Sequence, residues 1–428
     1  MKNEEKETSY EKTSIKDFKF MIILMLIIAV GAIAAPHAYN YIKQLKEDGY
    51  FDKLFKKDSN EEITTTTTKS PQEIITADNT GASSPVLYNG MIPVRYNYVK
   101  KIWVKADIEN LAKNEWYNYE NQEWANAVLV KEIGTKKRSY YEKANPDTEI
   151  KNEDILAFFV WIPRFKYSIK SSLGVQQIDV IFESASTSKS TGPNYITHPA
   201  FTFDKELDGF WIGKYEITGA ATSMTVLPNQ QSVTNQNIAS VFSTIQAMNG
   251  TAYGLSDDSK IKLIKNTEWG AVTYLTNSIY GRCKEEKCET VDSYYYNIDY
   301  NNQLLTSTTG NVTGVYALSG GVNEYVMANN NNIIGASGFD ENFMLSSKNY
   351  YDYYQDGTPE NYERAIDGDA TKEFGPITNY RSSWNSGQSI FVDSNNPWCV
   401  RGADNNLYSF TSANGGAQPN IGFRITIN

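Results

Sequence analysis

LSGGVNEYV at residues 318–326 and NIGFRITI at residues 420–427 are short β-like runs, each with one charged side chain among apolar neighbours. Charged residues of the same kind also occur in two other segments of this region, 266–272 and 400–406. Buried Arg and Glu are stable only when they are paired, so we expect structural ion pairs rather than catalytic groups. The four candidates are Glu268, Glu324, Arg401 and Arg424.

The region around these segments, residues 151–428, is rich in Gly and Asn and shows little helical periodicity. Strand-like runs occur at 155–169 and 209–218, and the pattern predicts helices only over 237–250 and Asn266–Thr276. Short strands, few helices and long polar loops are typical of an α+β domain.

Six segments of this region, taken in order, resemble one protein family, the formylglycine-generating (sulfatase-modifying) enzymes. These enzymes are a branch of the C-type-lectin-like fold. The segments that carry the resemblance are VWIPRFKYSI (160–169), HPAFTF to FWIGKYEITG (198–219), NTEWGAV (266–272), LSGGVNEYV (318–326), VRGADNN (400–406) and NIGFRITI (420–427). The resemblance implies a C-type-lectin-like head over residues 151–428.

The sequence lacks the residues that the family's chemistry requires. The enzymes bind copper through a cysteine pair after the motif that Arg401 begins, but the interval from Arg401 to Arg424 contains no Cys, and Cys399 precedes it. Related iron enzymes need three histidine-type ligands, and this chain has two His in all, His37 and His198. We therefore predict no enzyme activity and no cofactor, while a structural calcium ion and a carboxylate-based divergent enzyme stay open as alternatives.

Non-catalytic relatives with this fold bind ligands through the residues between the motif that begins at Arg401 and the strand that contains Arg424. The resemblance therefore implies a ligand-binding role for residues in this interval. Tyr supplies contact area there, and small polar side chains supply adaptable hydrogen bonds. The candidates are Asp404, Asn405, Asn406, Tyr408, Ser409, Ser412 and Asn414; an ordinary solvated loop is the alternative. Six further aromatic residues could border the same face: Tyr350, Tyr351, Tyr353, Tyr354, Trp384 and Trp398. Of these, we expect the two tryptophans to pack in the core.

Cys283 and Cys288 lie in the charged segment GRCKEEKCET. Their spacing suits a small disulfide-closed loop in an oxidising compartment.

Residues 85–150 read as a separate small β-rich module, with strand-like runs at 91–96, 101–107 and 115–130. Three tryptophans punctuate these runs: Trp103, Trp116 and Trp124. Core packing is the expected role for them, and an exposed platform for carbohydrate stacking is the alternative.

The N-terminal region contains an unbroken apolar run, FMIILMLIIAVGAIAA, from Phe20 to Ala35. At ~1.5 Å per residue, a helix over 20–42 would span ~34 Å, enough for a bilayer core. We expect residues 1–19 to be cytoplasmic and residues 43–84 to form a juxtamembrane segment with a Thr-rich stalk.

Two other interpretations of this helix stay open. A small-residue site at Ala32-Ile33-Ala34 would make it a signal peptide. The run AIAAPHAYNYIKQLK (32–46) also resembles the N-terminal helix of type IV pilins.

The whole chain has 428 residues and a formal net charge of −10, which argues against a nucleic-acid partner because phosphate binding needs clustered Lys and Arg. We predict a bacterial single-pass membrane protein whose extracellular head binds a protein or glycan without catalysis. A pilin-like filament or secretion-system subunit with the same head is the alternative. The sequence does not indicate an oligomeric state.

Overall fold

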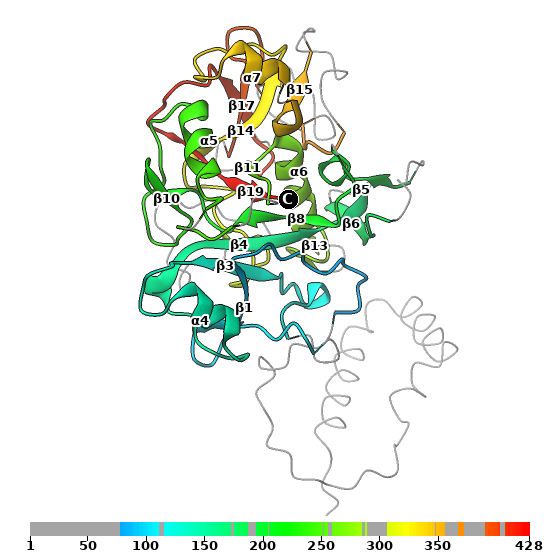
Figure 1. Ribbon diagram of the computed structural model, residues 1–428. Helices are drawn as coiled ribbons and strands as arrows, with labels where there is room; N and C mark the ends of the chain where they lie inside the picture. Colours follow the sequence, from blue (N-terminus) through cyan, green and yellow to red (C-terminus); the bar gives the residue numbers. More distant parts are fainter. Residues whose placement is uncertain are drawn as a thin grey trace, which may run out of the picture. The chain divides into compact units, whose positions relative to one another are not determined.

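The computed structural model describes the residues that form the head of the protein (Figure 1). The described ranges are 78–110, 115–172, 175–186, 194–203, 205–250, 252–255, 259–284, 287–288, 306–346, 348–355, 367–371, 390–402 and 407–428. They all lie within one unit, Lys69–Asn428. Every helix in these ranges is too short or too polar to cross a membrane, and the predicted span 20–42 lies outside them.

The largest sheet has seven strands, and every neighbouring pair in it is antiparallel. Its order is β11 (Ile261–Leu263), β19 (Ile425–Ile427), β8 (Gly209–Gly213), β4 (Ile155–Pro163), β3 (Asn126–Val130), β1 (Met91–Asn97) and β2 (Ile102–Lys105). The central strands β4 and β8 are buried on both faces. Burial on both faces explains why β4 reads as the continuous apolar run ILAFFVWIP rather than as an alternating pattern.

Residues 85–150 contribute β1, β2 and β3 to this sheet, so the sequence-predicted boundary at residue 150 falls inside one sheet. Strand β3 pairs with β4 across that boundary. All three tryptophans of this region are buried in the common core. The indole N–H of Trp124 donates to the carbonyl of Tyr280 at 2.7 Å, which ties the region to the following chain.

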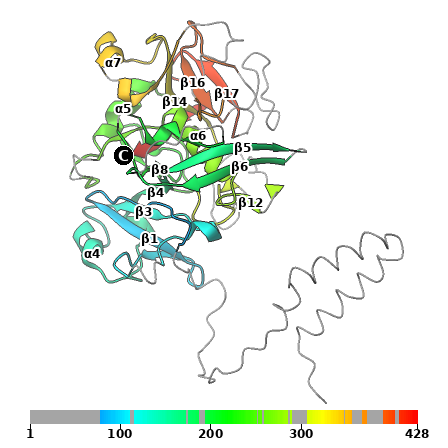
Figure 2. The same cartoon turned by 90° about the vertical axis from the view of Figure 1, so that its right-hand side faces the viewer.

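A second sheet of five strands forms the end of the head opposite β1 and β3 (Figures 1 and 2). Its order is β15 (Asp352–Tyr354), β14 (Asn323–Asn330), β16 (Trp398–Arg401) and β17 (Phe410–Ala413), and β18 (Ile421–Phe423) also pairs with β14. Strand β14 is antiparallel to β16 but parallel to β15 and β18.

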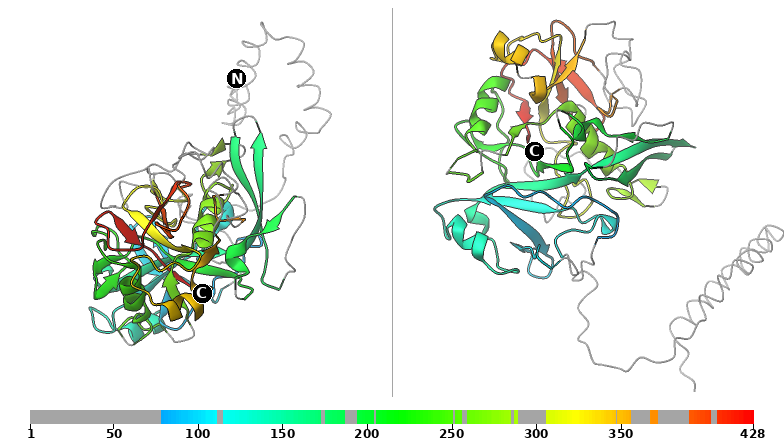
Figure 3. Two further views of the ribbon diagram at one scale, coloured as in Figure 1. Left: turned by 90° about the horizontal axis from the view of Figure 1, so that it is seen from above. Right: turned by 45° about the vertical axis from the view of Figure 1, so that its right-hand side comes forward.

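The remaining strands of the described residues form three small sheets. One is a long hairpin of β5 (Phe165–Ser172) and β6 (Val175–Phe182), with β7 (Ile196–Thr197) beside it, which extends from the body in Figures 2 and 3. The others are β9 (Thr218–Ala220) with β10 (Ser223–Thr225), and β12 (Cys283–Lys284) with β13 (Lys287–Cys288).

Helices are few in the described ranges, so the predicted α+β class with long loops is confirmed. They are α4 (Arg138–Lys143), α5 (Ile238–Gln246), α6 (Asn266–Thr276) and α7 (Glu341–Ser346), with 3₁₀ turns η1 (Tyr119–Asn121), η2 (Asn152–Asp154), η3 (Pro199–Phe201) and η5 (Lys348–Tyr350). Helices α5 and α6 occupy the two predicted segments. All residues of α6 are buried, which places this helix at the centre of the head.

Several predicted strands are shorter than expected. The run 155–169 is interrupted at Arg164 and the run 420–427 at Arg424, and both arginine side chains are fully buried. Arg164 pairs with Glu183 at 3.1 Å, and this residue lies between β4, which belongs to the seven-stranded sheet, and β5, which belongs to the three-stranded one. The run 115–130 forms a strand only over its last five residues.

Candidate ligand-binding surface

A buried ion pair joins two of the residues singled out from the sequence. The Nε and Nη2 atoms of Arg424 donate to the carboxylate of Glu324 at 2.6 to 3.1 Å, and both side chains are fully buried. The same guanidinium donates to the carbonyls of Gly213 and Tyr316, each at 3.0 Å. Arg424 therefore fastens β14 to the end of β8 and to the segment at residue 316.

A second carboxyl group, Glu216, lies beside this pair. It accepts hydrogen bonds from the Val322 N–H at 3.1 Å and from the Ser232 hydroxyl. Burial, with the charge of Glu324, raises the pKa of Glu216 to about 8, although Arg424 acts in the opposite direction. A Cβ atom at residue 321 would overlap the Glu216 carboxylate, and this close approach requires Gly321. Glu216 lies in the 198–219 segment but was not among the residues expected to pair.

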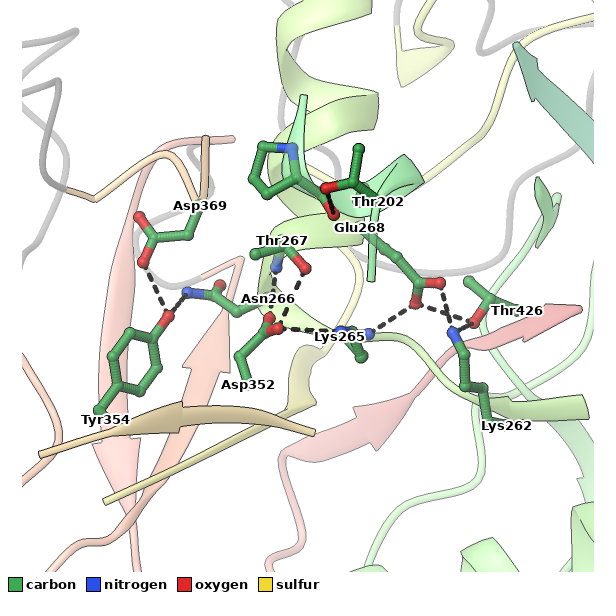
Figure 4. A network of polar contacts seen from close by, with 12 residues as sticks. Thr202, Lys262, Lys265, Asn266, Thr267, Glu268, Asp352, Tyr354, Asp369 and Thr426 are labelled. Carbon is green, nitrogen blue, oxygen red and sulfur yellow. Dashed lines mark hydrogen bonds and ion pairs between the residues drawn. The ribbon is translucent and has the colours of Figure 1, made fainter. Parts of the chain in front are cut away.

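Glu268 occupies the first turn of α6 and belongs to a larger polar network (Figure 4). Its carboxylate accepts from the Lys265 N–H at 2.9 Å, from the Thr426 hydroxyl at 3.0 Å and from the Lys262 ammonium. Lys262 also donates to Thr426 at 2.9 Å. The ionic partner of Glu268 is thus a lysine, and the contacts join α6 to β11 and β19.

The other half of the network joins α6 to the second sheet (Figure 4). Asp352 in β15 accepts from the N–H of Thr267 at 2.7 Å and pairs with Lys265 at 3.1 Å. Tyr354 accepts from the Asn266 amide at 2.8 Å and donates to Asp369 at 2.7 Å. Burial lowers the pKa of Lys265, while the charge of Asp352 opposes that shift.

Arg401 completes this network through neutral oxygen atoms. Its Nε donates to the Asn266 side-chain oxygen at 2.6 Å, and its other nitrogens reach backbone carbonyls, including that of Tyr408 at 3.3 Å. The guanidinium also lies over the Phe410 ring. The buried cations Lys262, Lys265 and Arg401 and the buried carboxylates Glu268, Asp352 and Asp369 are equal in number and bonded within the head. Their contacts join α6 to both sheets.

The predicted ligand-binding residues divide into three groups. Asp404, Asn405 and Asn406 lie outside the described residues. Tyr408 and Ser409 are fully buried, so the prediction that they lie on an exposed face needs correction: the backbone here is drawn inward where Arg401 binds the Tyr408 carbonyl. Ser412 is half-buried and Asn414 is exposed, and these two remain available to a ligand.

Aromatic rings form a partly exposed cluster at the same end of the head, and we name Phe339, Phe343 and Tyr350 the aromatic ridge. The rings of Phe339 and Phe343 stack with centroids 3.8 Å apart and 2° between their planes. Phe242 of α5 packs its edge beneath all three rings. The ridge residues are half-buried, and Leu345, two residues after Phe343 in α7, is 59% exposed.

The segment before α7 connects the ridge to Asn414. The Ala336 N–H donates to the Asn414 carbonyl at 2.7 Å, and the Trp398 indole donates to the Ile334 carbonyl at 3.0 Å. The Asn414 side chain accepts from the Gly416 N–H at 2.9 Å and so shapes its own turn.

Of the aromatic residues that were expected to border the face, Tyr350 belongs to the ridge and Tyr353 is half-buried, whereas Tyr351, Tyr354 and Trp398 are buried. Trp384 lies outside the described residues. Phe339 and Phe343 were not among the residues expected at this face. Phe339 lies before α7 and Phe343 within it, so no helical spacing marks the pair in the sequence.

The remaining candidates for chemistry are buried. His198 accepts from the Ala200 N–H at 3.2 Å, and burial lowers its pKa to about 3. Within the described ranges, no group of three or more His, Cys, Asp or Glu residues could hold a metal ion. Cys283 is disulfide-bonded and lies opposite Cys288 in the β12–β13 register, as the predicted disulfide-closed loop requires.

A scan against protein-family models and a search of curated proteins both find no match to this chain. The resemblance to formylglycine-generating enzymes therefore rests on the six sequence segments and stays a prediction.

Proposed function

We propose that this chain is a bacterial surface protein whose non-catalytic, C-type-lectin-like head binds a protein or glycan ligand. The ligand site consists of the aromatic ridge, Leu345 and the turn at Asn414. The single-pass helix proposed over residues 20–42 anchors the head outside the cell. The observation that carries the proposal is the stack of half-exposed rings at one end of a rigid sheet.

The ridge has the chemistry of a binding surface. Aromatic side chains combine a large contact area with few rotatable bonds, and they are enriched where proteins bind partners. Phe242 supports the ridge from below, and Phe339 also packs against Trp398 at 5.8 Å between centroids. Because the rings are held before binding, a ligand loses little free energy to ordering them.

The polar part of the site lies next to the ridge. Asn414, Gly335 and Ala336 are exposed, and Ser412 is half-buried in β17, the strand that ends just before Asn414. Small polar groups beside rigid rings can accept and donate hydrogen bonds to ligands of varied shape.

Two further observations support a displayed, non-catalytic head. The charged residues of the motifs have partners inside the fold, as a scaffold requires: Glu324 pairs with Arg424, Glu268 pairs with Lys262, and Arg401 donates to neutral oxygen atoms. A disulfide at Cys283 is stable in an oxidising compartment, which fits an extracellular location.

The proposal is tested with an array of glycans and surface proteins probed with residues 69–428. Leu345→Asp places a charge at an exposed position of α7, two residues after Phe343, and we expect it to abolish specific binding if Leu345 belongs to the site. Ile133→Asp is the matched control, because Ile133 is 84% exposed in the segment between β3 and α4. Equal binding by wild type and both variants would move the site away from the ridge, and no binding at all would overturn the receptor assignment.

A further inference from the structure

Lys214 is a fully buried lysine whose hydrogen bonds go to neutral oxygen atoms. Its Nζ donates to the side-chain oxygen of Asn126 at 2.8 Å and to the carbonyl of Gly314 at 2.9 Å. The rings of Trp103 and Tyr316 lie 5.1 and 5.4 Å from the same nitrogen. Lys262 and Lys265, the other buried lysines described above, instead contact carboxylates.

Asn126 is held just as firmly. Its side chain is 1% exposed, and its Nδ2 donates to the carbonyls of Trp124 at 2.9 Å and Thr313 at 2.8 Å. These two bonds fix the carboxamide with its oxygen toward Lys214. The backbone N–H of Trp124 also donates to the Thr313 hydroxyl at 2.9 Å, so the segment at 313–314 covers the pair.

The surroundings favour reaction between the two groups. Burial lowers the pKa of Lys214 well below its ordinary value, which increases the fraction of its amine in the neutral, nucleophilic form. Burial also raises the pKa of the neighbouring Glu123 to about 7, and Tyr98 donates a hydrogen bond to that carboxyl at 2.7 Å. A group that exchanges protons near neutral pH therefore lies close to the amine.

We propose that Lys214 and Asn126 form an intramolecular isopeptide bond. The lysine Nζ attacks Cγ of Asn126, and a new amide C–N bond replaces the bond between Cγ and Nδ2. The leaving nitrogen departs as ammonia with the proton that Nζ gives up. The reaction transfers no electrons and needs no oxidant or co-substrate.

The bond would connect distant parts of the main sheet. Asn126 lies in β3 and Lys214 directly follows β8, and both strands pair with β4 between them. The two residues are 88 positions apart in the sequence. A covalent link here would tie β1–β3 to the rest of the head.

Mass spectrometry of the full-length chain, reduced at its cysteines, tests the proposal. We expect an intact mass lower than the sequence mass by one ammonia. The tryptic map should contain a branched peptide in which Lys214 is joined to Asn126, and trypsin should not cleave after Lys214. Recovery of both residues in separate linear peptides would overturn the proposal, even if ammonia had been lost elsewhere in the chain.

Two variants locate the linkage. Lys214→Arg retains the positive charge but removes the reactive amine, and we expect the sequence mass and no branched peptide. Lys262→Arg is the matched control at a buried lysine paired with Glu268, and we expect it to retain the branched peptide. A branched peptide that persists in Lys214→Arg would assign the linkage to another residue and contradict the proposal.

Discussion

Arg424 and Glu324 form a fully buried, bidentate ion pair at the point where the chain leaves one sheet and enters the other. β18, immediately before Arg424, pairs with β14 in the five-stranded sheet, whereas β19, immediately after it, pairs with β8 and β11 in the seven-stranded sheet. One side chain thus holds the junction between the two sheets that form the head.

Breaking this pair should destabilise the whole head. Glu324→Gln leaves Arg424 buried without its counter-charge, and removal of one partner of a buried pair costs about 3–5 kcal/mol. Urea unfolding of residues 69–428 measures the loss. Glu149→Gln, in the exposed pair with Lys151 at 2.8 Å, is the control and should cost less than about 1 kcal/mol. Equal effects would show that Arg424 is satisfied by its carbonyl partners alone.

Glu216 should make the stability of the head depend on pH. Its folded-state pKa of about 8 lies above its ordinary value of 4.5, so the folded chain holds the proton more tightly. The resulting stabilisation is complete below pH 4.5 and is lost as the pH rises through 8.

Glu216→Gln should therefore flatten the fall of the unfolding free energy over that pH range. Urea midpoints measured at several pH values test this, with the exposed Glu120→Gln as control. An unchanged pH profile in Glu216→Gln would mean that the carboxyl is ionised in the folded chain.

Tyr408 and Ser412 should behave differently although both were predicted to bind a ligand. Tyr408→Ala empties a fully buried ring position and should cost about 3–5 kcal/mol, as large core truncations do. Ser412→Ala should stay within about 0.5 kcal/mol of wild type because its side chain is partly solvated. Thermal or urea unfolding compares them. A small loss of unfolding free energy in Tyr408→Ala would show that the Tyr408 side chain is not buried and could lie on the ligand-binding face.

Cys399 should be unreactive in the folded chain. It is a free, buried cysteine, and burial raises the pKa of its thiol to about 12, although Arg401 opposes the shift. Because the thiolate is the reactive form, a thiol reagent at pH 8 should modify Cys399 only after denaturant is added. Rapid modification of the native protein would show that this side of the sheet opens.

The sequence predicted those features that depend on local pattern. The helix α5 follows from its apolar spacing, and β4 follows from a long apolar run. The need to pair buried charges predicted an ionic role for Glu324 and Arg424, which contact each other across 100 positions of sequence.

Features that depend on tertiary neighbours were not predicted. The sequence of the strands β1–β3 does not show which sheet they join, so residues 85–150 were predicted to be a separate module. Tyr408 and Asn414 are alike in a loop pattern, yet Tyr408, whose carbonyl accepts from Arg401, is buried and Asn414 is exposed. The three residues of the aromatic ridge lie within positions 339–350, but they come from the segment before α7, from α7 itself and from η5, so no regular spacing marks them as one cluster.

Hydrogen–deuterium exchange of residues 69–428, with and without the ligand that the array identifies, tests the location of the binding site most directly. We predict slower exchange on binding in peptides covering 334–350 and 410–416, which contain the ridge and the Asn414 turn. Peptides covering 131–137 around Ile133 should not change. Protection confined to the β5–β6 hairpin or to residues 91–130, with none at the ridge, would contradict the account.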